Sequence, residues 1–381
     1  NGMSRDIALM RLMGPNPDAT LKFMERLVAE MRSKELLLEK GKRAARLVGR
    51  IHKGQPKLSD LYDVVTGAIN TPDSPLRASI LAGNRNILTS AYLGGAIFSA
   101  LSDRAFSVAT ETLNGVPHVK VMARAVKMLN PLSTNDRRLA TQAGFINDIA
   151  LGSAIGAQRY IGEIVGPMWT RRIADTSLRL GLLSPWTTWS RNAFALEFLA
   201  EFTNHLGRSF DNLLEPHRLA LERAGITSAD WDLIRATRPW TDAVTGTRIL
   251  RIHDVLGELS EGAAEAPTRQ RREFQRRFDV AMKLQSMVLE EADMAVPQVS
   301  ARTIAFITAG HREGTFFGDV ARNGFLFKSF LVTMVLTHLR RAAFGKNFGR
   351  HAKAKYAAQL IIGTTIMGVL GDQLNQLSKG R

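Results

Sequence analysis

Apolar residues in this chain recur at the three- and four-residue spacing of amphipathic helices, and several of these runs follow helix-start signals. Asn16-Pro17 places an N-cap residue before a proline at the first helical position, ahead of the helically spaced apolar residues of 21–31. Thr227 with Asp230 in the first turn predicts a second capped start. A charged helix is expected to begin at Thr268 and to run to about residue 292. No stretch shows sustained strand alternation between hairpin turns. The sequence therefore predicts an all-α, elongated multi-helix assembly without a significant β-sheet.

Proline- and glycine-bearing stretches suggest where this assembly divides. They predict an N-terminal helical region 1–130, a central Gly/Trp-rich helical region 131–245, a basic helical connector 246–296, and a C-terminal basic and apolar helical region 297–381. In the central region glycines recur every four residues, at Gly144, Gly152, Gly156 and again at Gly162 and Gly166. Such spacing suits either close packing inside one soluble domain or a membrane or oligomer interface. Because the sequence opens Asn1-Gly2-Met3, we expect it to be an internal piece of a longer chain.

The charge of the chain is strongly one-sided. Its 51 Lys and Arg exceed its 35 Asp and Glu, for a net charge of +16, and residues 325–381 hold nine of the basic residues against the single acid Asp372. Such a balance favours a polyanionic partner, either nucleic acid or anionic lipid.

The helix that begins at Thr268 is the predicted nucleic-acid contact. Its basic residues recur at i, i+3 and i+7, and Phe274 and Phe278 recur at i, i+4 on another face. Arginines on one face of a helix anchored through its aromatic side chains suit contact with phosphates. The expected nucleic-acid-binding residues are Arg269, Arg271, Arg272, Arg276 and Arg277. The alternative is an ordinary amphipathic helix whose arginines pair with Glu290, Glu291 and other acids.

Three nearly charge-free stretches of 15 residues are too short to be confident membrane spans: Ile87–Leu101, Phe325–Leu339 and Tyr356–Leu370. As helices they would reach roughly 22 Å, against about 30 Å for a bilayer core. Buried core helices are one interpretation. The other is that the last two stretches form a hairpin around a basic loop, with the loop on the cytoplasmic side.

The hairpin interpretation defines a predicted lipid site. The residues expected to meet membrane or anionic lipid are Arg340, Arg341, Lys346, Arg350, Lys353, Lys355, Ile362 and Ile366. Gly363 and Gly368 give the second stretch small faces, which would let copies of the chain pack closely and enclose Asp372.

The sequence carries no catalytic signature. The absence of cysteine excludes thiol nucleophiles and Cys-ligated metal sites. The His205/His217 and His338/His351 spacings do not place two rings on one helical turn, and there is no phosphate loop or Gly-x-Ser-x-Gly elbow. We therefore expect no enzyme, no metal and no cofactor within these residues.

Two regions carry a resemblance to a known family. One includes Arg179–Thr187, Phe194–Phe198, Gly225-Ile226-Thr227 and Asp230-Trp231-Asp232; the other includes Ala295-Val296-Pro297, Gly314–Asp319, Arg322 and Phe327–Phe330. In combination they resemble the C-terminal part of large tailed-bacteriophage internal virion or DNA-ejection proteins. Some of those proteins carry a lytic transglycosylase or another enzyme domain near the N-terminus, which would lie outside these residues.

The resemblance implies a protein that is stored in the capsid with the genome and leaves through the tail at infection. It would then form a ring-like homo-oligomeric channel or tunnel in the host envelope, at the periplasm and inner membrane. The implied partners are DNA without sequence preference, the host inner membrane or anionic lipid, and other phage ejection or portal proteins. The alternatives are an internal capsid protein that organises DNA and meets no membrane, and an accessory domain of an envelope-degrading enzyme whose active site lies elsewhere.

Overall fold

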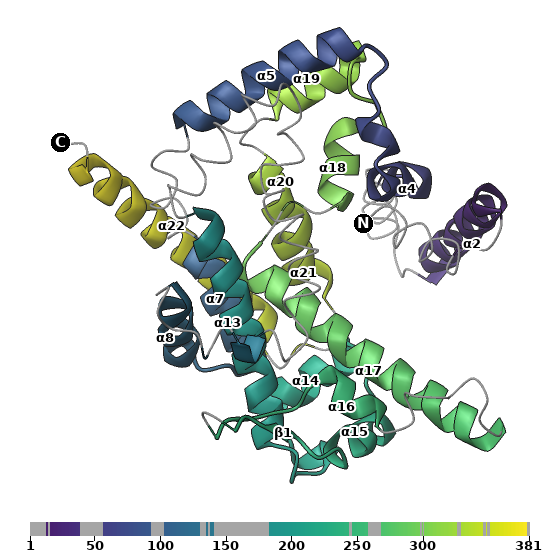
Figure 1. Ribbon diagram of the computed structural model, residues 1–381, viewed down its shortest axis with the longest axis vertical. Coiled ribbons are helices and arrows are strands. Elements are labelled where there is room, and N and C mark those ends of the chain that lie inside the picture. Colours follow the sequence, from purple (N-terminus) through teal and green to yellow (C-terminus); the bar gives the residue numbers. More distant parts are fainter. Residues whose placement is uncertain are drawn as a thin grey trace. The chain divides into compact units, whose positions relative to one another are not determined.

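The computed structural model describes residues 13, 16–38, 56–92, 103–129, 135, 138–140, 183–243, 246–257, 268–297, 299, 301–325, 329–345, 348 and 351–378. Within these residues the fold is all-α, as predicted (Figure 1). Described β-structure is limited to β1 (Trp240–Thr241) and β2 (Arg248–Ile249), an antiparallel pair in which Trp240 lies opposite Ile249. The glycine-rich stretch 144–166 lies outside the described residues.

The chain divides into two compact units that are described separately below. Unit 1 comprises Asn1–Arg85 and Val299–Ser329, and unit 2 comprises Asn86–Gln298 and Phe330–Arg381. The four consecutive regions expected from composition do not coincide with these units, because each unit combines segments that are far apart in the sequence. Local composition carries no signal of such long-range pairing.

Unit 1 contains α2 (Pro17–Leu38), α4 (Leu58–Thr66), a 3-10 turn (Ala68–Asn70), the start of α5 (Pro75–Tyr92), α18 (Ala301–Thr308) and α19 (Phe316–Gly324). The predicted start of α2 is confirmed: the side-chain oxygen of Asn16 accepts a hydrogen bond from the amide of Ala19 at 3.1 Å. Helix α18 packs against α4 and α19.

Buried polar contacts hold unit 1 together. The Arg85 guanidinium meets the Glu313 carboxylate at 2.5 Å, with side chains 0% and 1% exposed. Arg322, also buried, donates to the carbonyl of Ile69 at 3.2 Å. Gly314 has a φ of 80°, and a Cβ there would lie 2.7 Å from the amide nitrogen of Ser74, so this close approach requires glycine. The Gly314–Asp319 and Arg322 motif is thus part of the packing of this unit.

The core of unit 2 lies where α13 (Leu183–Asn204) packs against α8 (His118–Leu129) and α17 (Thr268–Ala295). Phe194, Phe198 and Phe202 are fully buried at i, i+4 spacing, with adjacent ring centroids 5.6 and 5.1 Å apart. Helix α7 (Asp103–Asn114) packs on the C-terminal half of unit 2 through α17 and α22 (Ala352–Ser378). Burial of these large apolar side chains is the main stabilising contribution.

The second predicted helix start is also confirmed. After η3 (Phe210–Asn212) and α14 (Glu215–Arg223), Thr227 caps α15 (Ser228–Arg235): its side-chain oxygen accepts from the Asp230 amide at 3.2 Å, and Asp230 accepts from the Thr227 amide at 3.1 Å. Trp231 is fully buried and donates to the carbonyl of Arg208. The short α16 (Ile252–Leu256) packs on α17, which runs three residues beyond its predicted end.

Candidate membrane and nucleic-acid surfaces

The first arm of the predicted hairpin does not form one apolar helix. Residues 326–328 lie outside the described part; the rest forms α20 (Ser329–Met334) and the π-helix η5 (Val335–Leu339), which continues into α21 (Arg340–Phe344). Thr333 and His338 are 1% and 2% exposed, and Met334 packs against the cluster of Phe106, Tyr356 and Leu360. This arm therefore contributes to the core of unit 2, which agrees with the alternative interpretation of a core helix.

His338 and Tyr356 form a buried polar pair beneath this arm. Nδ1 of His338 lies 2.7 Å from the Tyr356 hydroxyl. Burial, with help from the nearby Arg341 cation, lowers the pKa of His338 to about 3, and burial raises the pKa of Tyr356 to about 12. Both groups therefore stay neutral around pH 7, and their contact ties the π-helix to α22.

Among the described members of the predicted lipid set, Arg341 is the one that lies inside the protein. Its guanidinium donates to Glu291, a buried carboxylate on α17 that also accepts from Asn114 at 2.6 Å. Burial would raise the pKa of Glu291, but the charges of Arg341 and Arg223 hold that pKa below its ordinary value. The Arg341 side chain is 10% exposed, so the basic surface expected here lacks this charge.

The second arm is the long helix α22, whose two sides differ in their surroundings. Tyr356 and Leu360 are buried in the contact with α7, and a Cβ on Gly363 would lie 3.0 Å from the Cβ of Ala105. Gly363 therefore serves packing within the chain, which corrects the expectation that it meets another copy. The large apolar side chains of α22 that stay between 40% and 69% exposed are Ile361, Ile362, Ile366, Val369, Leu370, Leu374 and Leu377.

Basic side chains lie near the beginning of this helix. Arg340 is exposed at the start of α21, and Lys353 and Lys355 are exposed in the first turn of α22. The other two predicted lysine and arginine contacts, Lys346 and Arg350, lie outside the described residues. Of the expected lipid residues, Ile362 and Ile366 are 57% and 52% exposed on the apolar face of α22. Arg340, Lys353 and Lys355 are exposed cations near the beginning of that helix.

The predicted nucleic-acid helix is α17, and its first turns agree only in part with the expected arrangement. Phe278 is 39% exposed, so it does not anchor the helix as expected. Arg271, Arg272 and Arg276 are exposed. The Phe274 and Phe278 rings lie 6.2 Å apart, as their spacing suggests. Arg277 is only 26% exposed and lies 3.4 Å from Glu273, while the side chain of Arg269 lies outside the described part.

The alternative interpretation of this helix named Glu290 and Glu291 as partners of its arginines. Glu291 instead binds Arg341 and Asn114, so it is not a partner of the basic turns. The C-terminal half of α17 is core, with Val280, Leu284 and Val288 at 1% exposure or less. The helix is therefore anchored at one end and basic at the other.

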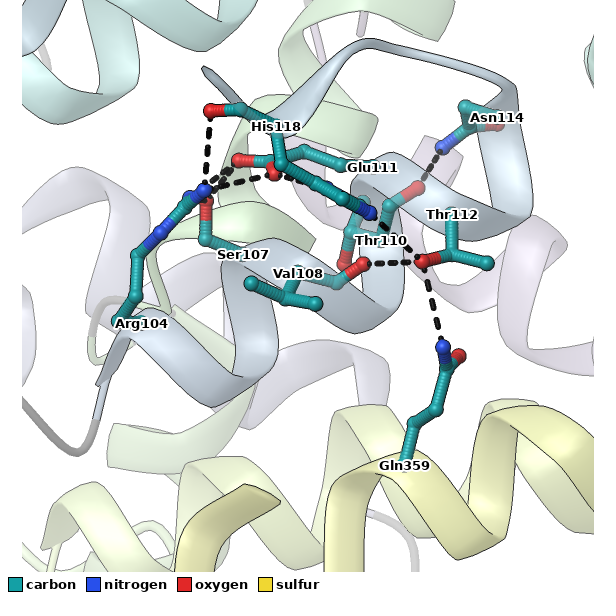
Figure 2. A network of polar contacts seen from close by, with 9 residues as sticks. All are labelled: Arg104, Ser107, Val108, Thr110, Glu111, Thr112, Asn114, His118 and Gln359. Carbon is teal, nitrogen blue, oxygen red and sulfur yellow. Dashed lines mark hydrogen bonds and ion pairs between the residues drawn. The ribbon is translucent and has the colours of Figure 1, made fainter. Parts of the chain in front are cut away.

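A polar network that the sequence analysis missed connects α7 with the starts of α8 and α22 (Figure 2). The fully buried carboxylate of Glu111 accepts from Arg104, from Ser107 at 2.5 Å and from His118 at 2.6 Å. Arg104, Ser107 and Glu111 recur at i, i+3 and i+7 on one face of α7, which was the available sequence signal. His118 lies across the turn at Gly115, where no local pattern links it to Glu111.

Three side chains of this network, Thr112, His118 and Glu111, lie in a row as a hydroxyl, an imidazole and a carboxylate. Nε2 of His118 lies 3.3 Å from the Thr112 hydroxyl, and its Nδ1 faces Glu111 (Figure 2). The Thr112 hydroxyl, however, donates to the carbonyl of Val108 at 2.8 Å and accepts from Gln359 at 3.3 Å. A hydroxyl has one proton, so Thr112 does not donate to His118 in this arrangement. The contacts suit a link between helices better than an activated nucleophile.

The fold also brings together two histidines whose sequence spacing does not place them on one helical turn. The His205 and His217 rings lie 4.8 Å apart between the end of α13 and α14. Burial, followed by the neighbouring His205, lowers the pKa of His217. Among the described residues no group of three or more His, Asp and Glu side chains could hold a metal ion.

None of the described helices combines the length and apolar character that crossing a bilayer requires. The motifs behind the family resemblance have structural roles where they are described: Asp230-Trp231 in a helix cap and the core, Gly314–Asp319 and Arg322 in unit 1. No protein-family model, curated protein or solved structure matches this chain.

Proposed function

We propose that this chain is a non-enzymatic structural segment of a phage virion protein that is ejected at infection. It associates with anionic membrane and with copies of itself through α22, and so forms a homo-oligomeric channel or tunnel that helps the genome cross the host envelope. The sequence resemblance supplies the phage setting, and the apolar face of α22 is the observation that carries the assembly and membrane role.

An exposed face of this size calls for a partner. Seven large apolar side chains of one helix are at least 40% exposed. Burying the exposed half of each would contribute on the order of 1 kcal/mol per residue. Contiguous exposed apolar surfaces mark interaction sites in soluble proteins. The exposed apolar side chains of α22, with cations near its beginning, suit an interfacial association in which the helix lies along the membrane surface.

The exposed cations favour an anionic lipid surface. Arg340, Lys353 and Lys355 lie near the start of the apolar face, and each contributes about 1 kcal/mol close to an anionic leaflet before screening. Asp372 is the acid within 325–381, and its carboxylate accepts from Gln376 at 2.7 Å. Binding is therefore expected to need both the apolar and the electrostatic contributions and to weaken with salt.

Self-association is supported by Gly368. This residue lies inside α22, where glycine costs about 1 kcal/mol relative to alanine. A Cβ there would meet no atom of the described residues within 4 Å, so packing against that part of the chain does not explain the glycine. A second copy that approaches α22 closely at this point would explain it.

Flotation of the full 381-residue chain with vesicles of phosphatidylglycerol and phosphatidylcholine tests the membrane role. We expect the wild type to float at low salt and the Ile362→Asp/Ile366→Asp variant to remain in the soluble fraction. The matched control is Val119→Asp/Val126→Asp, which changes two side chains on α8 that are 81% and 53% exposed. A wild type that stays soluble, or a control that loses flotation as fully as the α22 variant, would refute the proposal.

A second candidate function is DNA organisation inside the capsid, and the exposed arginines of α17 favour it. If Arg271, Arg272 and Arg276 each neutralise one phosphate, changing all three to glutamine flattens the slope of log K against log[salt] by up to about 2.7. The measurement is fluorescence anisotropy with a labelled duplex across a salt series. An unchanged slope excludes this helix as the DNA contact.

A further inference from the structure

Within unit 2, a cavity of about 260 Å³ lies on α7, between the first turns of α14 and α22. Helices α14 and α22 both pack against α7, which supplies Thr112 and Leu113 to the cavity. The α14 side supplies Glu215, Pro216 and Leu219; the α22 side supplies His351, Ala352, Lys355, Tyr356 and Gln359. Lys355 is one of the cations assigned above to the lipid surface, and Thr112 and Gln359 belong to the polar network.

The cavity has opposite charges on its two sides. Glu215 comes from the first turn of α14 and Lys355 from the first turn of α22. Across the described residues, neither the Glu215 carboxylate nor the Lys355 ammonium makes an ion pair or a side-chain hydrogen bond. Both side chains are exposed, so each can reach a bound molecule without first breaking an internal contact.

The remaining lining groups are mostly apolar or already engaged. Leu113, Pro216 and Leu219 present apolar surface. The Tyr356 hydroxyl faces His338 and the Gln359 amide donates to Thr112, so these two offer mainly a ring face and one carbonyl. The charged groups that the lining offers a ligand are thus Glu215 and Lys355, with the imidazole of His351 as a further polar group.

The backbone at the mouth of the cavity is unusual. His351, which precedes α22, has a φ of 62°, a left-handed conformation that a residue with a Cβ adopts at a cost of order 1 kcal/mol. Backbone strain of this kind is concentrated at ligand-binding positions. His351 lines the cavity together with Lys355.

We infer that this cavity binds a small amphipathic zwitterion. Its ammonium group meets Glu215, its acid group meets Lys355, and an apolar body rests on the leucines of α7 and α14. The volume is just below the range of about 300–1,000 Å³ that holds drug-sized ligands and cofactors. The volume is therefore sufficient for a ligand of the size of an amino acid or a phospholipid headgroup.

Two classes of ligand have this chemistry, a free amino acid and a phospholipid headgroup, and one probe for each distinguishes them. Free L-leucine represents an amino acid, and glycerophosphoethanolamine represents a zwitterionic headgroup. Equilibrium dialysis against the full chain is expected to show saturable, millimolar binding of at least one of them, and the tighter probe identifies the source. Failure of both to bind up to about 10 mM would overturn the inference.

Ligand analogues test the two-charge recognition without altering the protein. Isoamylamine lacks the acid of leucine, and 4-methylpentanoate lacks its ammonium. For an amino-acid ligand each analogue should bind about tenfold more weakly than leucine; for a headgroup ligand, glycerophosphate should bind about tenfold more weakly than glycerophosphoethanolamine. Equal binding of a single-charge analogue would contradict recognition by both Glu215 and Lys355.

Variants locate the site. Glu215→Gln and Lys355→Gln should each weaken binding about tenfold. Lys127→Gln is the matched control, because Lys127 is exposed on α8 and does not line the cavity. Loss of as much affinity in the Lys127 variant as in the Lys355 variant would also contradict the inference. Because all three residues are exposed, none of these changes is expected to unfold the chain.

Discussion

Replacing each of two glycines on α22 by alanine separates packing within the chain from packing between copies. Gly368 and Gly363 lie on the same helix, five residues apart, and the change is one methyl group at each. At Gly368 the new methyl would meet no atom of the described residues within 4 Å, whereas at Gly363 it would lie 3.0 Å from the Cβ of Ala105.

The structure gives opposite signs for the two changes. Gly368→Ala should stabilise the unassembled chain by about 0.5–1 kcal/mol, because alanine is the better helix former and loses less backbone entropy. Gly363→Ala gains the same propensity but must separate α22 from α7. Overpacking typically costs about 1–3 kcal/mol, so a net loss on the order of 1 kcal/mol is expected.

Tryptophan fluorescence during urea unfolding measures both effects. All five tryptophans lie between residues 169 and 240, within unit 2, so the signal reports the unit that contains α22. Sedimentation of the vesicle-bound or concentrated protein measures assembly. There Gly368→Ala should weaken self-association although it stabilises the separate chain.

Two results would refute this reasoning. If Gly363→Ala is as stable as Gly368→Ala, α22 does not pack on α7 as described. If Gly368→Ala self-associates as strongly as the wild type, no second copy approaches the helix at that position, and the assembly role of α22 loses its support.

Two further predictions concern the buried groups beneath α22. Arg341→Met leaves Glu291 buried without its main partner and should lower the free energy of unfolding, measured in urea, by about 3–5 kcal/mol. The control Arg340→Met changes an exposed neighbour and should cost less than about 0.5 kcal/mol. Similar losses in the two variants would mean that the Arg341–Glu291 pair is not buried. Since the pKa of His338 is lowered from 6.5 to about 3, the unfolded chain binds a proton that the folded chain does not, and stability should fall by up to about 1.4 kcal/mol for each pH unit below about 6.5. In His338→Gln that part of the pH dependence should disappear, and an unchanged slope between about pH 6 and about pH 5 would contradict the burial of the neutral ring.

Local features were predictable because their causes are local. The Asn16 and Thr227 caps follow from residues within one helical turn of each other, and the structure confirms them. Helix α17 begins at Thr268, as predicted. The pairing of Phe274 with Phe278 depends in the same way on i, i+4 spacing.

Long-range partners were not predictable because sequence spacing does not encode them. Arg341 belonged to a basic run and gave no sign that Glu291, 50 residues earlier, would bury it. Unit 1 joins Arg85 to Glu313 across 228 residues, which no composition boundary suggests. The same limit applies to Gly363, where a small residue at regular spacing indicates a close contact without identifying its partner.

The candidate surfaces divide along the same line. The sequence shows that this stretch has more apolar residues than one side of a helix can bury. Some of them, such as Ile362 and Ile366, therefore stay exposed. The cavity between α14 and α22 combines residues 112–113, 215–219 and 351–359, so it exists only in the folded chain.

A spin label on α22 tests the central proposal most directly. The chain contains no cysteine, so Ile366→Cys provides a single labelling site, and Val119→Cys on α8 provides an exposed control. On addition of anionic vesicles, we predict that the label at 366 loses mobility, becomes accessible to oxygen and shows dipolar broadening from neighbouring copies, while the label at 119 changes little. An unchanged spectrum at 366, or equal changes at both positions, would contradict a membrane-associated assembly built on α22.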